Sequence, residues 1–185
     1  MAGGGVLIDI GTHVIDIGFH ILLEKQMQAV QFAQGTVKHA EQYGAQWNIN
    51  NDETQQKKFD VETWAKGKIL FVNNSILRFN VDWSSDVNED ITSIKAIGNN
   101  GKVMINTLFG FSKHFTRKNI EILYEGINGK YEKILYPMHN TFALDAFRDM
   151  VRYFINATNR KATGILQPSD SMYVVDAIEQ LYSSI

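Results

Sequence analysis

The sequence contains no cysteine. Without thiols there can be no disulfide framework, no thiolate nucleophile and no zinc or iron–sulfur site with cysteine ligands. A reducing compartment fits this composition best, so we expect a cytoplasmic protein. The chain also lacks an excess of either charge, since 18 Lys and Arg stand against 20 Asp and Glu. No bulk field therefore attracts a nucleic acid or an anionic membrane surface, and neither is an expected partner.

One dense apolar stretch runs from Val6 to Leu23, but it lacks the basic flank of a signal peptide. Four ionisable side chains interrupt it: Asp9, His13, Asp16 and His20. We therefore expect neither a signal peptide nor a membrane span. The apolar residues are too dense for a surface helix, so the stretch predicts a mostly buried helix over residues 6–24. A strand over residues 6–10 is the alternative, because β-branched residues are frequent there.

Strand patterns fill the middle of the chain. Apolar and polar residues alternate there, and turns rich in Asn and Gly separate the segments. The predicted strands are residues 29–38, 59–72, 75–83, 92–97, 102–106, 120–124 and 131–135. One strand carries an apolar row that is unsuited to a strand with both sides in water. The row consists of Leu77, Phe79, Val81 and Trp83.

Helical spacing returns after residue 139. A helix is predicted from a cap at Asn140 or Thr141 to about Ala157, with an apolar stripe on the side expected to be buried. The stripe consists of Phe147, Val151, Phe154 and Ile155. Pro168 suits the first turn of a last helix. Its apolar side is expected to include Met172, Val175, Ile178, Leu181 and Tyr182.

The order of helix, strands and two helices predicts an α+β fold. We expect a single domain over residues 1–185, with an open, largely antiparallel sheet and helices packed on one face. The chain is long enough for one such domain with a core of its own, and 44% of its residues are hydrophobic.

The four ionisable residues of the first predicted helix follow one another at i, i+4, i+7 and i+11, which places them on one helical face. Burying them unpaired would be costly, so they must face a cleft, water or one another. Three interpretations are open. In the first, the four residues are hydrogen-bonded structural residues. In the second, Asp9 and His13 bind a metal. In the third, a carboxylate orients an imidazole that exchanges a proton with an alcohol.

A family resemblance bears on this choice. The run from Gly3 to Asp16 contains three glycines, a short apolar stretch, and then Asp9, Gly11, His13 and Asp16. It resembles a signature of the glucose-fructose oxidoreductase and inositol dehydrogenase family. The resemblance implies that Asp9 and His13 are catalytic, with Asp9 holding the substrate and His13 handling the proton. It also implies that Asp9, Thr12 and His13 bind a sugar or cyclitol.

The resemblance further implies that the parent protein binds its dinucleotide through a separate domain. Complete family members begin with a Rossmann domain that binds NAD or NADP, and neither its glycine-rich turn nor its catalytic lysine motif is found in this sequence. We therefore expect a truncated carboxy-terminal domain, inactive alone and binding no dinucleotide. Members pair through the open face of the sheet, so a homodimer or tetramer is expected. A non-catalytic oligomerisation or interaction module is the alternative function.

Overall fold

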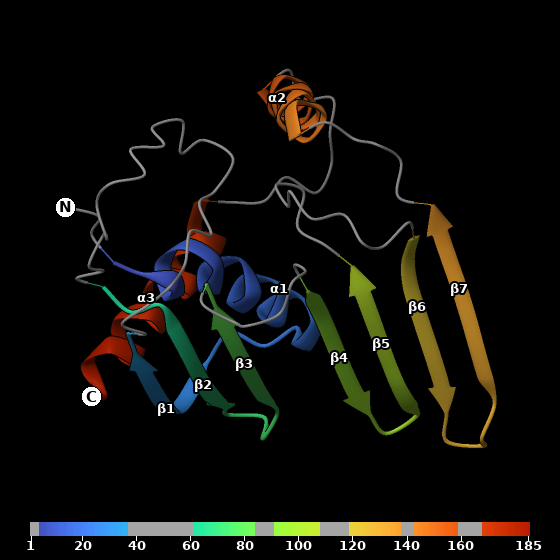
Figure 1. The fold of residues 1–185 in the computed structure, drawn as a ribbon, viewed down its shortest axis with the longest axis horizontal. Helices are drawn as coiled ribbons and strands as arrows, with labels where there is room; N and C mark the ends of the chain where they lie inside the picture. The colour runs from blue at the N-terminus through green and yellow to red at the C-terminus, as the bar shows by residue number, and fades with distance from the viewer. Residues whose placement is uncertain (1–3, 37–60, 84–90, 108–118, 138–142, 159–167) are drawn as a thin grey trace, which may run out of the picture. The chain divides into compact units, whose positions relative to one another are not determined.

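The computed structural model describes residues 4–36, 61–83, 91–107, 119–137, 143–158 and 168–185 (Figure 1). The chain divides into two compact units. The first unit combines residues 1–43, 51–85 and 166–185, and the second combines residues 44–50 and 86–165. The predicted α+β class with antiparallel sheets is confirmed, and the seven strands form one three-stranded and one four-stranded sheet.

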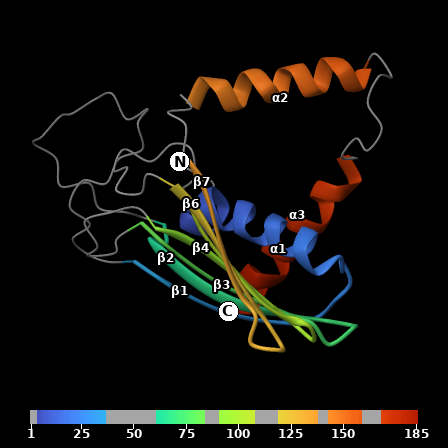
Figure 2. The same cartoon turned by 90° about the vertical axis from the view of Figure 1, so that its right-hand side faces the viewer.

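The first unit holds the three-stranded sheet and the helices from both ends of the chain. Its elements are η1 (Leu7–Gly11), α1 (Thr12–Leu22), β1 (Met27–Gly35), β2 (Trp64–Phe71), β3 (Ile76–Asp82) and α3 (Pro168–Ser183). The sheet order is β1-β2-β3, and both pairings are antiparallel. Helices α1 and α3 contact each other and lie on the same side of this sheet (Figure 2).

The first helix was predicted correctly, with one local difference. Its first five residues, Leu7–Gly11, form a π-helix that continues into α1, so the alternative of a strand over residues 6–10 is wrong. The helix ends at Leu23, which adopts the left-handed conformation with φ 52°. Gly18 allows the helix to approach β3 closely, because a Cβ there would lie 2.5 Å from Cδ2 of Leu77.

The core of this unit lies between the sheet and the helices. It draws buried side chains from all of its elements except β1. These are Val6, Leu7, Ile15, Phe19, Ala65, Ile69, Phe71, Phe79, Val81, Val174, Ala177, Ile178 and Leu181. Phe19 and Phe71 meet edge to face with ring centroids 5.5 Å apart, an arrangement that aromatic quadrupoles favour. The apolar row predicted on β3 therefore faces the core, where Phe79 and Val81 are buried.

The opposite face of the three-stranded sheet carries a basic cluster beside the apolar side chains of Trp64, Leu70 and Ile76. Lys68 and Arg78 are direct cross-strand partners on this face. Lys66, two residues before Lys68 on β2, lies on the same face. The ammonium group of Lys66 lies 5.6 Å from the ring centroid of Trp64, within the range of a cation–π contact. The part of this face around Lys66, Lys68 and Arg78 is therefore suited to water.

The last helix starts at Pro168 as predicted, but its buried stripe differs. Val174, Ala177, Ile178 and Leu181 are the buried residues, at the i, i+3, i+4, i+7 spacing of one helical face. Met172 and Val175 were expected to be buried and are 64% and 50% exposed. The choice was wrong because spacing by threes alone drifts around a helix with 3.6 residues per turn.

The second unit holds the four-stranded sheet and one helix. Its strands are β4 (Thr92–Gly98), β5 (Gly101–Thr107), β6 (Asn119–Gly126) and β7 (Tyr131–Pro137), and its helix is α2 (Ala143–Thr158). All three pairings are antiparallel, in the order β4-β5-β6-β7. The hairpins predicted around the Gly98–Gly101 turn and around Asn128-Gly129 are confirmed.

The two faces of this sheet differ in chemistry. On one face a row of isoleucines crosses all four strands in register: Ile94, Ile105, Ile122 and Ile134. The first three are half-buried and Ile134 is 43% exposed. On the other face, ion pairs join Lys102 to Glu125 and Lys133 to Glu121. Cross-strand ion pairs of this kind are typical of a solvated surface.

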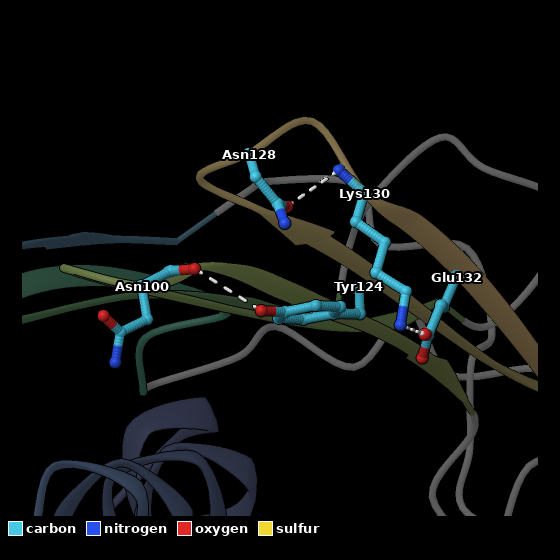
Figure 3. A network of polar contacts seen from close by, with 5 residues as sticks. All are labelled: Asn100, Tyr124, Asn128, Lys130 and Glu132. Carbon is cyan, nitrogen blue, oxygen red and sulfur yellow. Dashed lines mark hydrogen bonds and ion pairs between the residues drawn. The ribbon is translucent and has the colours of Figure 1, made fainter.

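Polar contacts fix the two turns at one end of this sheet. The carbonyl oxygen of Asn100 accepts hydrogen bonds from the Ile127 amide at 3.1 Å and from the Tyr124 hydroxyl at 3.4 Å. The side-chain oxygen of Asn128 accepts from the Lys130 amide at 3.1 Å, and the Lys130 ammonium group pairs with Glu132 (Figure 3). The contacts of Asn100 join the two hairpins, and those of Asn128 and Lys130 lie within the second one.

The predicted stripe on α2 is not buried. Phe147, Val151, Phe154 and Ile155 are 49% to 67% exposed. A spacing pattern identifies the apolar side of a helix, but burial also requires a partner surface, which the described residues do not provide here. The caps proposed at Asn140 and Thr141 lie outside the described residues. None of the helices in the described ranges combines the length and apolar character needed to cross a membrane.

Candidate functional site

The two residues expected to be catalytic stand on consecutive helical segments. Asp9 belongs to η1 and His13 to α1, and both side chains are exposed. Thr12, the third expected substrate ligand, is half-buried, and its hydroxyl donates a 2.8 Å hydrogen bond to the carbonyl of Ile8. In this arrangement the hydroxyl proton is engaged by the helix, and the Thr12 oxygen can accept a further hydrogen bond.

Asp9 is oriented by a residue that is 74 positions away in the sequence. The indole Nε1 of Trp83 donates a hydrogen bond of 3.2 Å to Oδ2 of Asp9. Trp83 follows the last residue of β3, and its own amide donates to the carbonyl of Thr63 at 2.8 Å. A donor held at the end of the sheet therefore orients the whole carboxylate of Asp9, including Oδ1, the oxygen that Trp83 does not contact.

Sequence reasoning placed Trp83 only in an apolar strand row and missed this contact. The available signal was the residue type. A tryptophan at the end of a strand carries one N–H that requires an acceptor when the ring is partly buried.

Further along the same helix, Asp16 and His20 form a local pair. Nδ1 of His20 lies 2.9 Å from the carbonyl oxygen of Asp16 and 3.5 Å from Oδ1 of its carboxylate, and both side chains are about half exposed. A carbonyl oxygen can only accept, so Nδ1 carries the proton. In neutral His20 this leaves Nε2 as the basic nitrogen, pointing away from the pair.

The glycine-rich entry to this helix is held by a buried carboxylate. Glu62, just before β2, is 7% exposed. Its carboxylate accepts hydrogen bonds of 3.1 Å from the amides of Gly5 and Leu7, and one of 2.7 Å from the hydroxyl of Tyr182. Burial, followed by the hydrogen bond to Glu62, holds the pKa of Tyr182 well above its ordinary value.

This geometry decides whether the glycines can hold a dinucleotide. Pyrophosphate groups bind where free backbone amides converge at a helix start. Here the amides of Gly5 and Leu7 already donate to Glu62, whose negative charge would repel a phosphate. A nicotinamide dinucleotide therefore does not fit this turn. Nor do three or more His, Asp or Glu side chains converge as a metal site anywhere in the described residues.

No protein-family model matches the sequence, and no curated protein sequence matches it. Solved structures do match. An oxidoreductase domain protein from Kribbella flavida superposes with a TM-score of 0.72 and 17% identity, over 99% of this chain and 50% of that protein. Levoglucosan dehydrogenase in complex with NADH superposes with a TM-score of 0.69 and 16% identity, over 100% of this chain and 49% of the enzyme. Aldose-aldose oxidoreductase from Caulobacter crescentus, complexed with glycerol, superposes with a TM-score of 0.63 and 18% identity, over 99% of this chain and 46% of the enzyme.

This chain has the same fold as a portion of each of these oxidoreductases, about half of each protein. The likeness confirms the fold that the sequence resemblance implied, and these structure neighbours are oxidoreductases of the type that the resemblance indicates. The chain spans about half of their length. At identities of 12% to 18%, the likeness carries the fold, and the roles of individual residues rest on the geometry described above.

Proposed function

We propose that this chain is the substrate-binding and oligomerisation part of an NAD(P)-dependent oxidoreductase that acts on a secondary alcohol of a sugar or cyclitol. The observation that carries the proposal is the exposed Asp9–His13 stripe, with Asp9 held by Trp83, on a fold shared with sugar oxidoreductases. One neighbour was solved with NADH and L-sorbose and another with glycerol. Polyols and sugars are therefore the first ligands to test.

In this proposal, the residues of the chain bind the substrate and move one proton. The carboxylate of Asp9 accepts a hydrogen bond from a substrate hydroxyl through the oxygen that Trp83 leaves available. His13, one helical turn further on, accepts the hydroxyl proton of the carbon that is oxidised. The glycine turn does not fit a dinucleotide, so this proposal assigns the dinucleotide to another part of the parent protein. No further step is assigned to the residues of this chain.

The proposal is tested directly on the chain by titration with polyols. The ring Cε1–H signal of His13 and the indole N–H signal of Trp83 in NMR spectra report on the two ends of the site. We expect glycerol, sorbose or inositol at millimolar concentration to shift both signals, and the Asp9→Asn variant to lose the response. Signals that stay unchanged with every polyol would refute substrate binding here.

The alternative, a non-catalytic oligomerisation module, is favoured by a separate observation. The isoleucine row of the four-stranded sheet is only half-buried, whereas the open face of the three-stranded sheet carries the basic side chains of Lys68 and Arg78. If two copies stacked through the face that carries Lys68 and Arg78, these side chains would lie near the same positive charges of the second copy, which is destabilising. We therefore propose that a homodimer or tetramer forms through the isoleucine face, with or without catalysis.

A further inference from the structure

Glu62 is a buried residue whose carboxylate accepts hydrogen bonds from one short backbone segment and from one tyrosine. Its side chain is 7% exposed. Oε1 accepts from the amides of Gly5 and Leu7 and from the Tyr182 hydroxyl, and Oε2 accepts from Gly5 as well. A buried carboxylate is costly unless such donors replace its water, and bonds to an ionised acceptor are about twice as strong as neutral ones.

The backbone of Glu62 completes the contact. Its carbonyl accepts the amide of Val6 at 3.0 Å, so a single residue binds three consecutive amides at the start of the helix. The next link reaches the site itself, because the carbonyl of Gly5 accepts the amide of Asp9 at 3.1 Å. The path from the buried carboxylate to the backbone of Asp9 thus passes through one residue, Gly5.

Close approach explains why residue 5 is a glycine. A Cβ at that position would lie 2.1 Å from the carbonyl oxygen of Glu62 and 2.5 Å from Oε2. Neither atom is free to move away without breaking the amide contacts. The glycine is therefore required by a carboxylate within the protein rather than by an external phosphate.

We infer that Glu62 is a positioning residue for the candidate site: it fixes the turn from which Asp9 projects toward Trp83, and Tyr182 connects this turn to α3. The inference rests on the proposed function only where it concerns polyol binding. Its geometric part, the control of the Asp9–Trp83 contact, stands independently of any substrate.

The test compares Glu62→Gln with Glu179→Gln, a matched change at an exposed position of α3. An amide at residue 62 has one acceptor oxygen and places an N–H donor against the Gly5 amide. In the Glu62→Gln variant we expect the Trp83 indole N–H signal, assigned with Trp83→Phe, to move toward its position in Asp9→Asn. We expect the dissociation constant for the polyol bound by the wild type to rise about tenfold. Glu179→Gln should match the wild type in both measurements.

The Trp83 signal tests the positioning role of Glu62, and the polyol dissociation constant tests the proposed function, so either can fail without the other. A folded Glu62→Gln variant with an unchanged Trp83 signal would overturn the positioning role. If the wild type binds no polyol, the proposed function fails, whereas the Trp83 signal still decides the role of Glu62. If Glu62→Gln does not fold, Tyr182→Phe removes one of the donors and leaves the carboxylate in place. A smaller shift of the same Trp83 signal is then expected, and no shift would overturn the inference.

Discussion

The indole of Trp83 donates a 3.2 Å hydrogen bond to the carboxylate of Asp9, which joins the end of β3 to the first turn of the helical stripe. The two residues are far apart in the sequence, and of the two only Asp9 was expected to belong to a site. Their contact places a carboxylate with one directed and one available oxygen beside the segment that carries His13.

Replacing Trp83 tests whether this hydrogen bond orients Asp9 for ligand binding. Trp83→Phe keeps an aromatic ring but removes the N–H donor, so the carboxylate loses its fixed direction. We expect affinity for the bound polyol to fall about tenfold, the size expected for the loss of one charge-assisted hydrogen bond of roughly 1.5 kcal/mol. Isothermal titration calorimetry measures the change.

Trp64→Phe is the matched control, because Trp64 lies on the open face of the same sheet. It should leave polyol affinity unchanged. Equal losses in both variants would mean that the affinity depends on general stability and not on the orientation of Asp9.

Dinucleotide binding by the chain alone is expected to be absent. The only glycine-rich helix start in the described residues is occupied by Glu62. Calorimetric titration with NAD and with NADP should therefore show no heat of binding up to millimolar ligand. Micromolar binding of either dinucleotide would contradict the account of this turn and would require a site elsewhere in the chain.

Assembly through the isoleucine face predicts a homodimer or tetramer in light scattering at tens of micromolar. Ile122→Glu places a charge in the centre of the row and should yield monomers, because burying it at an apolar interface is costly. Leu123→Glu is the matched control, since this neighbour lies on the opposite face of β6, where Met104 is its cross-strand partner. A monomeric wild type, or disruption only by Leu123→Glu, would refute the assignment of the face.

The stability of the first unit should fall in alkali through Tyr182. Its pKa is raised in the folded state, by burial first and then by the hydrogen bond to Glu62. The contribution is therefore complete below about pH 10, the pKa of an unfolded tyrosine, and is lost as pH rises above that value. Urea unfolding at pH 8 and at pH 11 should show a smaller alkaline loss for Tyr182→Phe than for the wild type.

Tyr131→Phe controls for tyrosine ionisation elsewhere, because Tyr131 is 59% exposed. It should keep the alkaline loss of the wild type. An equal loss in Tyr182→Phe would show that the contact with Glu62 does not govern the pH dependence.

The sequence predicted the elements well where local signals were strong. Turns with Asn and Gly located the hairpins at Gly98–Gly101 and Asn128-Gly129, and Pro168 located the start of α3. Burial was less predictable, because it depends on a partner surface. The stripe on α2 is apolar but exposed, and Met172 was mistaken for a core residue.

The candidate site was only partly predictable for a similar reason. The spacing of Asp9 and His13 could be seen in one helical segment, but the contacts that orient Asp9 come from Trp83 and, through Gly5, from Glu62. Such long-range hydrogen bonds leave no periodic signal in a sequence. The three glycines were interpreted from a family signature, and the structure gives the physical reason for one of them, Gly5.

Proton transfer by His13 is tested by steady-state reduction of NAD and NADP with a panel of polyols, by a protein in which a dinucleotide-binding domain precedes this chain. We expect polyol-dependent reduction, and we expect His13→Ala to slow the chemical step by about 10²- to 10⁴-fold, since a general base contributes that much. His20→Ala should stay near the wild-type rate. An unchanged rate in His13→Ala would contradict the assignment of proton transfer to His13.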